Sequence, residues 1–176
     1  MRNLLALALA TLSVASQAIV VPTGFFPTAP ALRSNFDSMA AGPYTSFPVF
    51  SGNGIAATFG GGGSLNVGPP AAFLSPPNAM FGAGTDVQIR MNIPMRRFGG
   101  YFHDIVLSSG VSATSATFKF YDVSNTLIGS ATAPITPTWT WIGYKTAPKW
   151  VRVEITGNVG GTLGGVVMDN LRVRPN

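Results

Sequence analysis

Apolar residues occupy every second position in two stretches of the chain, residues 86–93 and 150–156. The shorter segments 118–120 and 171–173 repeat this alternation. A period of two predicts β-strands that turn one face to a core and the other to water. The predicted core comprises these alternating residues: Val87, Ile89, Met91, Phe118, Phe120, Val151, Val153, Ile155, Leu171 and Val173.

The same alternation predicts which side of each strand the remaining residues face. Ile93 falls on the core side of the first stretch, whereas Arg152 and Glu154 fall on the water side of the second. Each stretch therefore predicts a strand that is half buried and half solvated.

Turn residues separate these segments, and helix-favouring residues are scarce. The chain has 21 Gly and 14 Pro, which interrupt every long segment. Short strands without intervening helices predict an all-β fold, an antiparallel β-sandwich of the jelly-roll type. Residues 60–84 are rich in Gly and Pro and are expected to be irregular, either as a binding surface or as a cover without a ligand.

The N-terminus has the pattern of a cleaved signal peptide. Arg2 precedes an uncharged apolar run, and Ser16-Gln17-Ala18 supplies small residues at the positions that a signal peptidase recognises. A membrane anchor is the alternative, but a spanning helix needs roughly 20 apolar residues and this run is shorter. We therefore expect a signal peptide at residues 1–18, a single domain at 19–176, no transmembrane segment after processing, and a secreted, extracellular or cell-surface location.

The content of cysteine and of charged residues limits which kinds of molecule the protein is expected to bind. The chain has no cysteine, and only 10% of its residues are charged, so the fold must rely on packing and hydrogen bonding. Residues 19–176 carry ten Lys and Arg against six Asp and Glu, a net charge of +4. Because no basic run is present, a mild attraction to acidic polymers is expected but no nucleic-acid site is.

Seven segments follow one another in a recognisable order along residues 31–174: Phe36-Asp37-Ser38, Phe98-Gly99-Gly100-Tyr101-Phe102, Phe118-Lys119-Phe120-Tyr121-Asp122, Leu127-Ile128-Gly129-Ser130, Trp141-Ile142-Gly143-Tyr144, Val151-Arg152-Val153-Glu154-Ile155 and Val167-Met168-Asp169-Asn170-Leu171-Arg172-Val173. In this order the chain resembles secreted bacterial jelly-roll proteins of the kind associated with PEP-CTERM sorting signals and, more distantly, galactose-binding-like carbohydrate-binding modules. It stops at Arg174-Pro175-Asn176 without the sorting tail, so release or surface adsorption is expected rather than covalent sorting.

Asp37 and Asp169 form a candidate metal site. The first and last strands of a jelly roll are neighbours, and Asp169 shares parity with Leu171, which predicts an inward carboxylate. A buried carboxylate needs a partner, and Ca²⁺ takes six to eight oxygen ligands. Modules of the resembling class often hold a structural calcium in this corner. The alternative is that Asp169 accepts backbone N–H donors and needs no metal.

The tryptophans and Tyr144 are candidates for sugar stacking. Trp139 and Trp141 stand two residues apart on one strand face, the spacing of a stacking platform. Aromatic residues more often pack in cores, so we expect Trp141 and Trp150 in the core. Trp139 and Tyr144 are the predicted ligand-binding residues.

No residue pattern indicates catalysis. His103-Asp104 is the only His–carboxylate neighbour pair, but neighbours on a strand point to opposite faces, so Asp104 is poorly placed to orient His103. The predicted function is a non-catalytic envelope or matrix protein that binds a glycan or cell-surface polysaccharide. A self-associating structural subunit is the alternative, and a secreted hydrolase comes third.

Overall fold

The computed structural model describes residues 19–20, 31–59, 64–68, 78–83, 86–104, 113–159, 162–164 and 166–176. The predicted signal peptide, residues 1–18, lies outside these ranges. The described residues form thirteen strands and one short 3₁₀ turn, η2 (Phe50–Gly52). The strands are β1 (Ile19–Val20), β2 (Leu32–Ser34), β3 (Gly42–Tyr44), β4 (Ser46–Val49), β5 (Gly54–Phe59), β6 (Ser64–Gly68), β7 (Ala79–Ala83), β8 (Asp86–Asp104), β9 (Ser115–Tyr121), β10 (Leu127–Pro134), β11 (Thr140–Val159), β12 (Thr162–Gly164) and β13 (Val166–Arg174).

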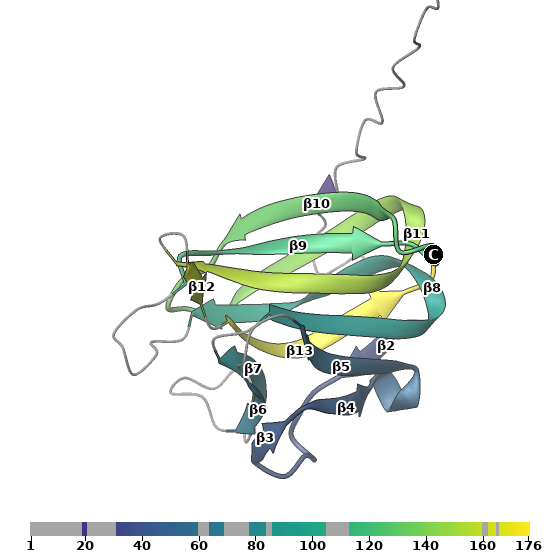
Figure 1. The fold of residues 1–176 in the computed structure, drawn as a ribbon. Coiled ribbons are helices and arrows are strands. Elements are labelled where there is room, and N and C mark those ends of the chain that lie inside the picture. The colour runs from purple at the N-terminus through teal and green to yellow at the C-terminus, as the bar shows by residue number, and fades with distance from the viewer. Residues whose placement is uncertain are drawn as a thin grey trace, which may run out of the picture.

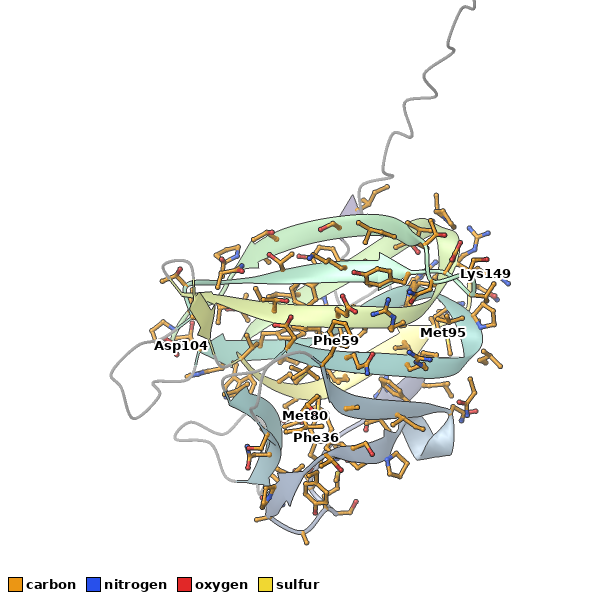
Figure 2. All side chains as sticks on the ribbon, viewed as in Figure 1. Phe36, Phe59, Met80, Met95, Asp104 and Lys149 are labelled. Atoms are coloured by element: carbon orange, nitrogen blue, oxygen red, sulfur yellow. The ribbon has the colours of Figure 1, made fainter. Side chains whose placement is uncertain are left out.

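Two long strands connect the layers of the fold. The first half of β8 pairs with the second half of β11, and the two remaining halves also pair with each other. Between these halves Trp150 pairs with Met95, and the register of the ladder shifts on both sides of this pair. Figure 2 shows Met95 and Lys149 at one end of the molecule and Asp104 at the other. Both strands therefore turn at the same end and pass from one layer to the other.

All strand pairs are antiparallel, and they form two layers (Figure 1). The first layer has the order β10–β9–β11–β8–β5–β4, using the second half of β11 and the first half of β8. The second has the order β1–β11–β8–β13, with β2 and β7 both pairing with β13 and β6 and β3 continuing from β7. The prediction of an all-β antiparallel sandwich is confirmed.

Aromatic rings fill the space between the layers. Phe118 and Phe120 of β9 lie 6.1 and 6.3 Å from the ring of Phe98 on β8, measured between ring centroids. Phe118 also lies 5.0 Å from Tyr144 of β11, and Phe120 lies 5.7 Å from Trp150. Because β9 belongs to one layer and these partners lie in the other or at the bend, the rings pack the two layers together.

Nine of the ten predicted core residues are buried, and the one exception lies near the bend. Val151 is only partly buried, beside the register shift that follows Trp150. Ile93, which shares the inward parity, is 45% exposed because the regular ladder of β8 with β11 ends at Arg90. Arg152 and Glu154 lie on the outward side of the sheet, as predicted, but the prediction that they are solvated is wrong, since each is only 6% exposed.

The glycine-rich stretch 60–84 is more regular than predicted. It contains β6 and β7, which pair with each other from Ser64↔Ala83 to Gly68↔Ala79. The expectation of an irregular segment is therefore wrong for these residues, while 60–63, 69–77 and 84 lie outside the described residues. In the described part of the chain, no helix is long and apolar enough to cross a bilayer.

Replacing Phe120 by Ala should lower the free energy of unfolding by about 3–5 kcal/mol, because its ring is fully buried among other rings. Val123→Ala is the control, since Val123 is 75% exposed and should change stability by no more than about 0.5 kcal/mol. Urea denaturation measures both values. Similar losses for the two variants would contradict this description of the core.

Candidate functional site: two outward sheet faces and the Asp169 corner

The outward face of the first layer carries three rows of side chains that run across five strands. Directly paired residues of an antiparallel sheet point to the same side, and the strand registers align the rows from β5 through β8, β11 and β9 to β10. We call this surface the Arg152 face. Its rows are Ile55–Arg90–Arg152–Tyr121–Leu127, Ala57–Gln88–Glu154–Lys119–Ser130 and Phe59–Asp86–Thr156–Thr117–Thr132. In the third row a side-chain hydrogen bond joins Asp86 of β8 to Thr156 of β11.

A network of polar contacts holds Arg152 at the centre of this face. Its guanidinium pairs with Glu154 and donates through Nη2 to Asn125 Oδ1 at 2.6 Å. The guanidinium carbon also lies 3.7 Å from the centre of the Tyr121 ring and 5.7 Å from that of Phe59. Tyr121 completes the network by donating its hydroxyl to Glu154 Oε2 at 2.7 Å. Planar stacking with fork-like hydrogen bonding is the chemistry that distinguishes Arg from Lys.

Burial shifts the proton affinities of two groups on the Arg152 face. It lowers the pKa of Arg152, with a smaller lowering from Arg90, and Tyr121 acts in the opposite direction. Burial raises the pKa of Asp86, and the hydrogen bond from Thr156 and the charge of Lys119 partly offset this.

An open pocket of about 400 Å³ lies at the end of the Arg152 face where the long strands turn. Arg90 and Arg152 line it from the strands, and Asp122, Val123 and Asn125 line it from the β9–β10 turn. Val123 and the nearby Leu127 are both exposed. The pocket thus combines charged donors, an amide, a carboxylate and apolar surface within one concavity, which is the usual make-up of a small-molecule site.

The outward face of the second layer carries Trp141, one of the three tryptophans that the sequence singles out. Trp141 pairs with Tyr101, whose ring lies 5.4 Å away, and a Cβ on Gly99 would come within 2.6 Å of the indole. The Trp141 side chain therefore lies across Gly99 on the outside of the sheet. The prediction that Trp141 packs in the core is wrong, whereas Trp150 is fully buried as predicted. Trp139 precedes β11, is half buried and contacts the His103 ring at 5.2 Å.

Tyr144 is a core residue, which corrects its assignment to a ligand surface. Only 1% of it is exposed, and its ring packs against Phe118 and Phe120. It alternates with Trp141 and Lys145 along β11 and so points inward. Tyr144 and Trp141 both line a pocket of about 280 Å³. Burial raises the pKa of Tyr144 to about 12. Its hydroxyl has no hydrogen-bond partner among the described residues.

Tyr144→Phe should leave the protein as stable as the parent at pH 7, or more stable by about 1–2 kcal/mol, because it removes a buried, unsatisfied hydroxyl. The folded-state pKa is raised, so the parent should lose stability as the pH rises from about 10 to about 12, when only the unfolded chain ionises. The variant should lose less over that range. Chemical denaturation at pH 7, 10 and 11.5 measures the difference, and equal alkaline losses would contradict it.

The Asp169 corner lies where the first and last strands of the domain meet. β2 pairs with β13 from Leu171↔Ser34 to Val173↔Leu32, which confirms the predicted neighbourhood of the terminal strands. Asp37 follows β2 and accepts the backbone N–H of Asn78 at 3.5 Å. Asn78 leads into β7, which pairs with β13 up to Met168. The segment that bears Asp37 thus lies beside the part of β13 that carries Asp169.

A bulge in β13 overturns the predicted direction of Asp169. Asp169 pairs with Tyr101 and Arg172 with Gly99, so β13 has one residue more than β8 between these pairs. Asn170 occupies the bulge with a φ of 49°, a conformation that Asn tolerates. Asp169 therefore shares the side of Tyr101 rather than that of Leu171, although it is fully buried.

Hydrogen bonds within the protein already use part of the acceptor capacity of the Asp37 and Asp169 carboxylates. Asp169 Oδ1 accepts the N–H of Asn170 at 2.6 Å, and Asp37 Oδ2 accepts Nδ2 of Asn35 at 2.9 Å. Among the described residues no group of three His, Cys, Asp or Glu forms a metal cluster. These contacts agree with the hydrogen-bonded alternative, while carboxylate, amide and carbonyl oxygens remain suitable ligands for Ca²⁺. Calcium at this corner stays a prediction.

Calcium binding at the corner would raise the melting temperature, since saturation at 100 times the dissociation constant adds about 2.7 kcal/mol. Melts of chelator-stripped protein with and without Ca²⁺ should then differ, and Asp169→Asn should remove the difference. Coincident melts of the stripped parent would leave the hydrogen-bonded alternative as the correct one.

His103 and Asp104 are closer than the strand alternation predicts. The Asp104 Oδ1 atom lies 3.3 Å from His103 Nδ1, and the Asp104 carbonyl oxygen lies 2.5 Å from the same nitrogen. The prediction that Asp104 is poorly placed to orient His103 is therefore wrong. The alternation of side-chain directions does not apply to His103 and Asp104, because they lie at the end of β8. There the N–H of Asp104 donates a hydrogen bond to the carbonyl oxygen of Thr136.

Comparisons with known proteins establish the fold alone. No family model matches the chain, and no curated protein matches it. A family 29 carbohydrate-binding module from Piromyces equi superposes with a TM-score of 0.51 at 8% identity, over 84% of this chain and 92% of that one. A variant of CBM29-2 complexed with mannohexaose gives 0.51 at 10% identity, over 81% and 91%. The enzymatically active domain of bacteriophage CBA120 tailspike protein 4 gives only 0.42 at 17% identity; this chain spans 19% of that one. The chain thus has a fold similar to that of carbohydrate-binding modules.

Proposed function

We propose that this protein is a secreted, non-catalytic module that binds a neutral glycan on the Arg152 face. The observation that carries the proposal is the stacked and hydrogen-bonded Arg152 beside an open pocket. Sugars present hydroxyl groups around apolar ring faces, so they need directional donors and acceptors next to apolar surface. The Arg152 face supplies both within one pocket.

Preorganisation is the physical advantage of this arrangement. Arg152 is held by Glu154, Asn125 and Tyr121 before any ligand arrives. A donor that is already ordered loses little side-chain entropy on binding. The neighbouring rows add hydroxyl and amide groups along the strands, so the face can extend over several sugar units.

The proposal that the protein is non-catalytic is supported by the partners of the carboxylates on the Arg152 face. Glu154 is committed to Arg152 and Tyr121, and Asp122 accepts two N–H groups within its own turn, from Ser124 and Thr126. Glycosidases need one carboxyl that is free to donate a proton and another that faces the sugar. The structural similarity to carbohydrate-binding modules supports the same class of function, and the signal-peptide pattern supports secretion.

Exposed residues of the pocket give the sharpest test. Calorimetric titration with mannohexaose, xylohexaose and cellohexaose should find a ligand for the parent protein. Arg90→Ala and Asn125→Ala should each weaken that ligand about tenfold, a loss typical of removing one important contact. Both side chains are exposed, so their removal should leave the fold intact, although Ala at position 125 adds some backbone strain because Asn125 has a φ of 63°. Removing Arg152 itself would leave Glu154 buried without its partner and would unfold the protein as readily as it would abolish binding.

Arg33→Ala is the control, because it removes an exposed cation from the other layer and should leave neutral-glycan affinity unchanged. Equal losses in all three variants would contradict a site on the Arg152 face. Absence of binding to any neutral oligosaccharide, or concentration-dependent assembly that Asn125→Ala abolishes, would favour the self-associating alternative instead.

A further inference from the structure

Half of the cations in residues 19–176 lie on one outward surface of the second layer. The registers align Lys145, Arg97 and Arg174 across β11, β8 and β13. They also pair Arg172 with Arg33 across β13 and β2, one row further on. We call these five residues the basic row. Their strand neighbours Phe98, Tyr144 and Val173 are buried in the core, so the basic row points outward.

Four of the five cations of the basic row have no acidic partner among the described residues. Arg33, Lys145, Arg172 and Arg174 form no ion pair with any residue in the described ranges. Burial lowers the pKa of Arg172 and Arg97, and a like-charged neighbour lowers each further, Arg33 in the first case and Arg174 in the second. Adjacent, partly desolvated cations repel one another, so an anion on this surface would relieve a cost already present in the fold.

Trp141 borders the basic row and adds apolar contact. Arg172 lies with its guanidinium carbon 5.5 Å from the indole centre, and the indole lies across Gly99. An indole ring beside outward-pointing guanidinium groups suits a ligand that alternates sugar rings with negative charges.

We infer that the basic row and Trp141 bind an anionic polysaccharide with one carboxylate per sugar, such as a polyuronate. Neighbouring strands lie about 4.8 Å apart, so the row presents cations at intervals close to the length of one sugar in an extended chain. Double-helical nucleic acid fits less well, because its sequence and shape are read by an element that enters a groove, and these cations stand on a sheet. This surface lies on the other layer from the Arg152 face and does not depend on the function proposed for that face.

Affinity electrophoresis and calorimetry with alginate test the inference. The triple variant Arg33→Gln/Lys145→Gln/Arg174→Gln should bind alginate about tenfold more weakly at 0.15 M salt, as expected for three partly exposed charge pairs. The dependence of log affinity on log salt should flatten by about 0.7 for each cation removed. The control triple variant Arg96→Gln/Lys119→Gln/Lys149→Gln has the same net charge, leaves the pocket beside Arg152 intact, and should retain the affinity of the parent.

Equal losses in the two triple variants would overturn the inference, because only net charge would then matter. It would also fail if duplex DNA displaced alginate at matched charge concentration, or if neutral mannan did so. Trp141→Ala should weaken alginate binding without changing the salt slope, whereas an unchanged affinity would remove the indole from the site. Neutral-oligosaccharide binding by the basic-row variant should equal that of the parent, so failure here is distinguishable from failure at the Arg152 face.

Discussion

Ring packing between β9 and the bent strands β8 and β11 holds the two layers together. Phe118 and Phe120 reach across the sandwich to Phe98, Tyr144 and Trp150. The chain has no cysteine, so no disulfide shares this task, and dispersion and desolvation of these rings supply the main stabilising term. The bend at the Met95–Trp150 pair lets the same two strands serve both layers. Packing of the inward side chains fixes the position of each strand, and the strand in turn fixes the positions of its outward side chains.

The consequence is a molecule with two chemically different outward faces. On the first layer the central cation, Arg152, is paired with Glu154, and the surface presents fixed hydrogen-bonding groups. On the second layer the cations stand next to one another, as Arg172 and Arg33 show. Internally paired charges favour a neutral ligand, because no net charge must be matched, whereas adjacent cations favour an anionic one. A polysaccharide-binding role is compatible with both.

Local alternation predicted the strands well because side-chain direction within a strand depends only on parity. Phe118 and Phe120 are buried for this reason. The predicted inward direction of Asp169 was wrong, because the bulge at Asn170 turns the Asp169 side chain to the other side of the sheet. The pattern of apolar and polar residues in the sequence gives no sign of this bulge. The burial of Arg152 could not be predicted from the sequence either, since its partner Tyr121 comes from a strand 31 residues away and pairs with it only in the folded sheet. Pairing between distant strands is set by the whole core rather than by any single segment.

Mapping a bound ligand onto the sheet tests the central claim most directly. Amide chemical shifts of isotopically labelled protein would be followed by NMR during titration with the tightest-binding neutral hexasaccharide. We expect the perturbed amides to lie in β5, the first half of β8, β9, the second half of β11 and the β9–β10 turn, around Arg152 and Asn125. Perturbations confined to β13 and the surroundings of Trp141 would contradict the account.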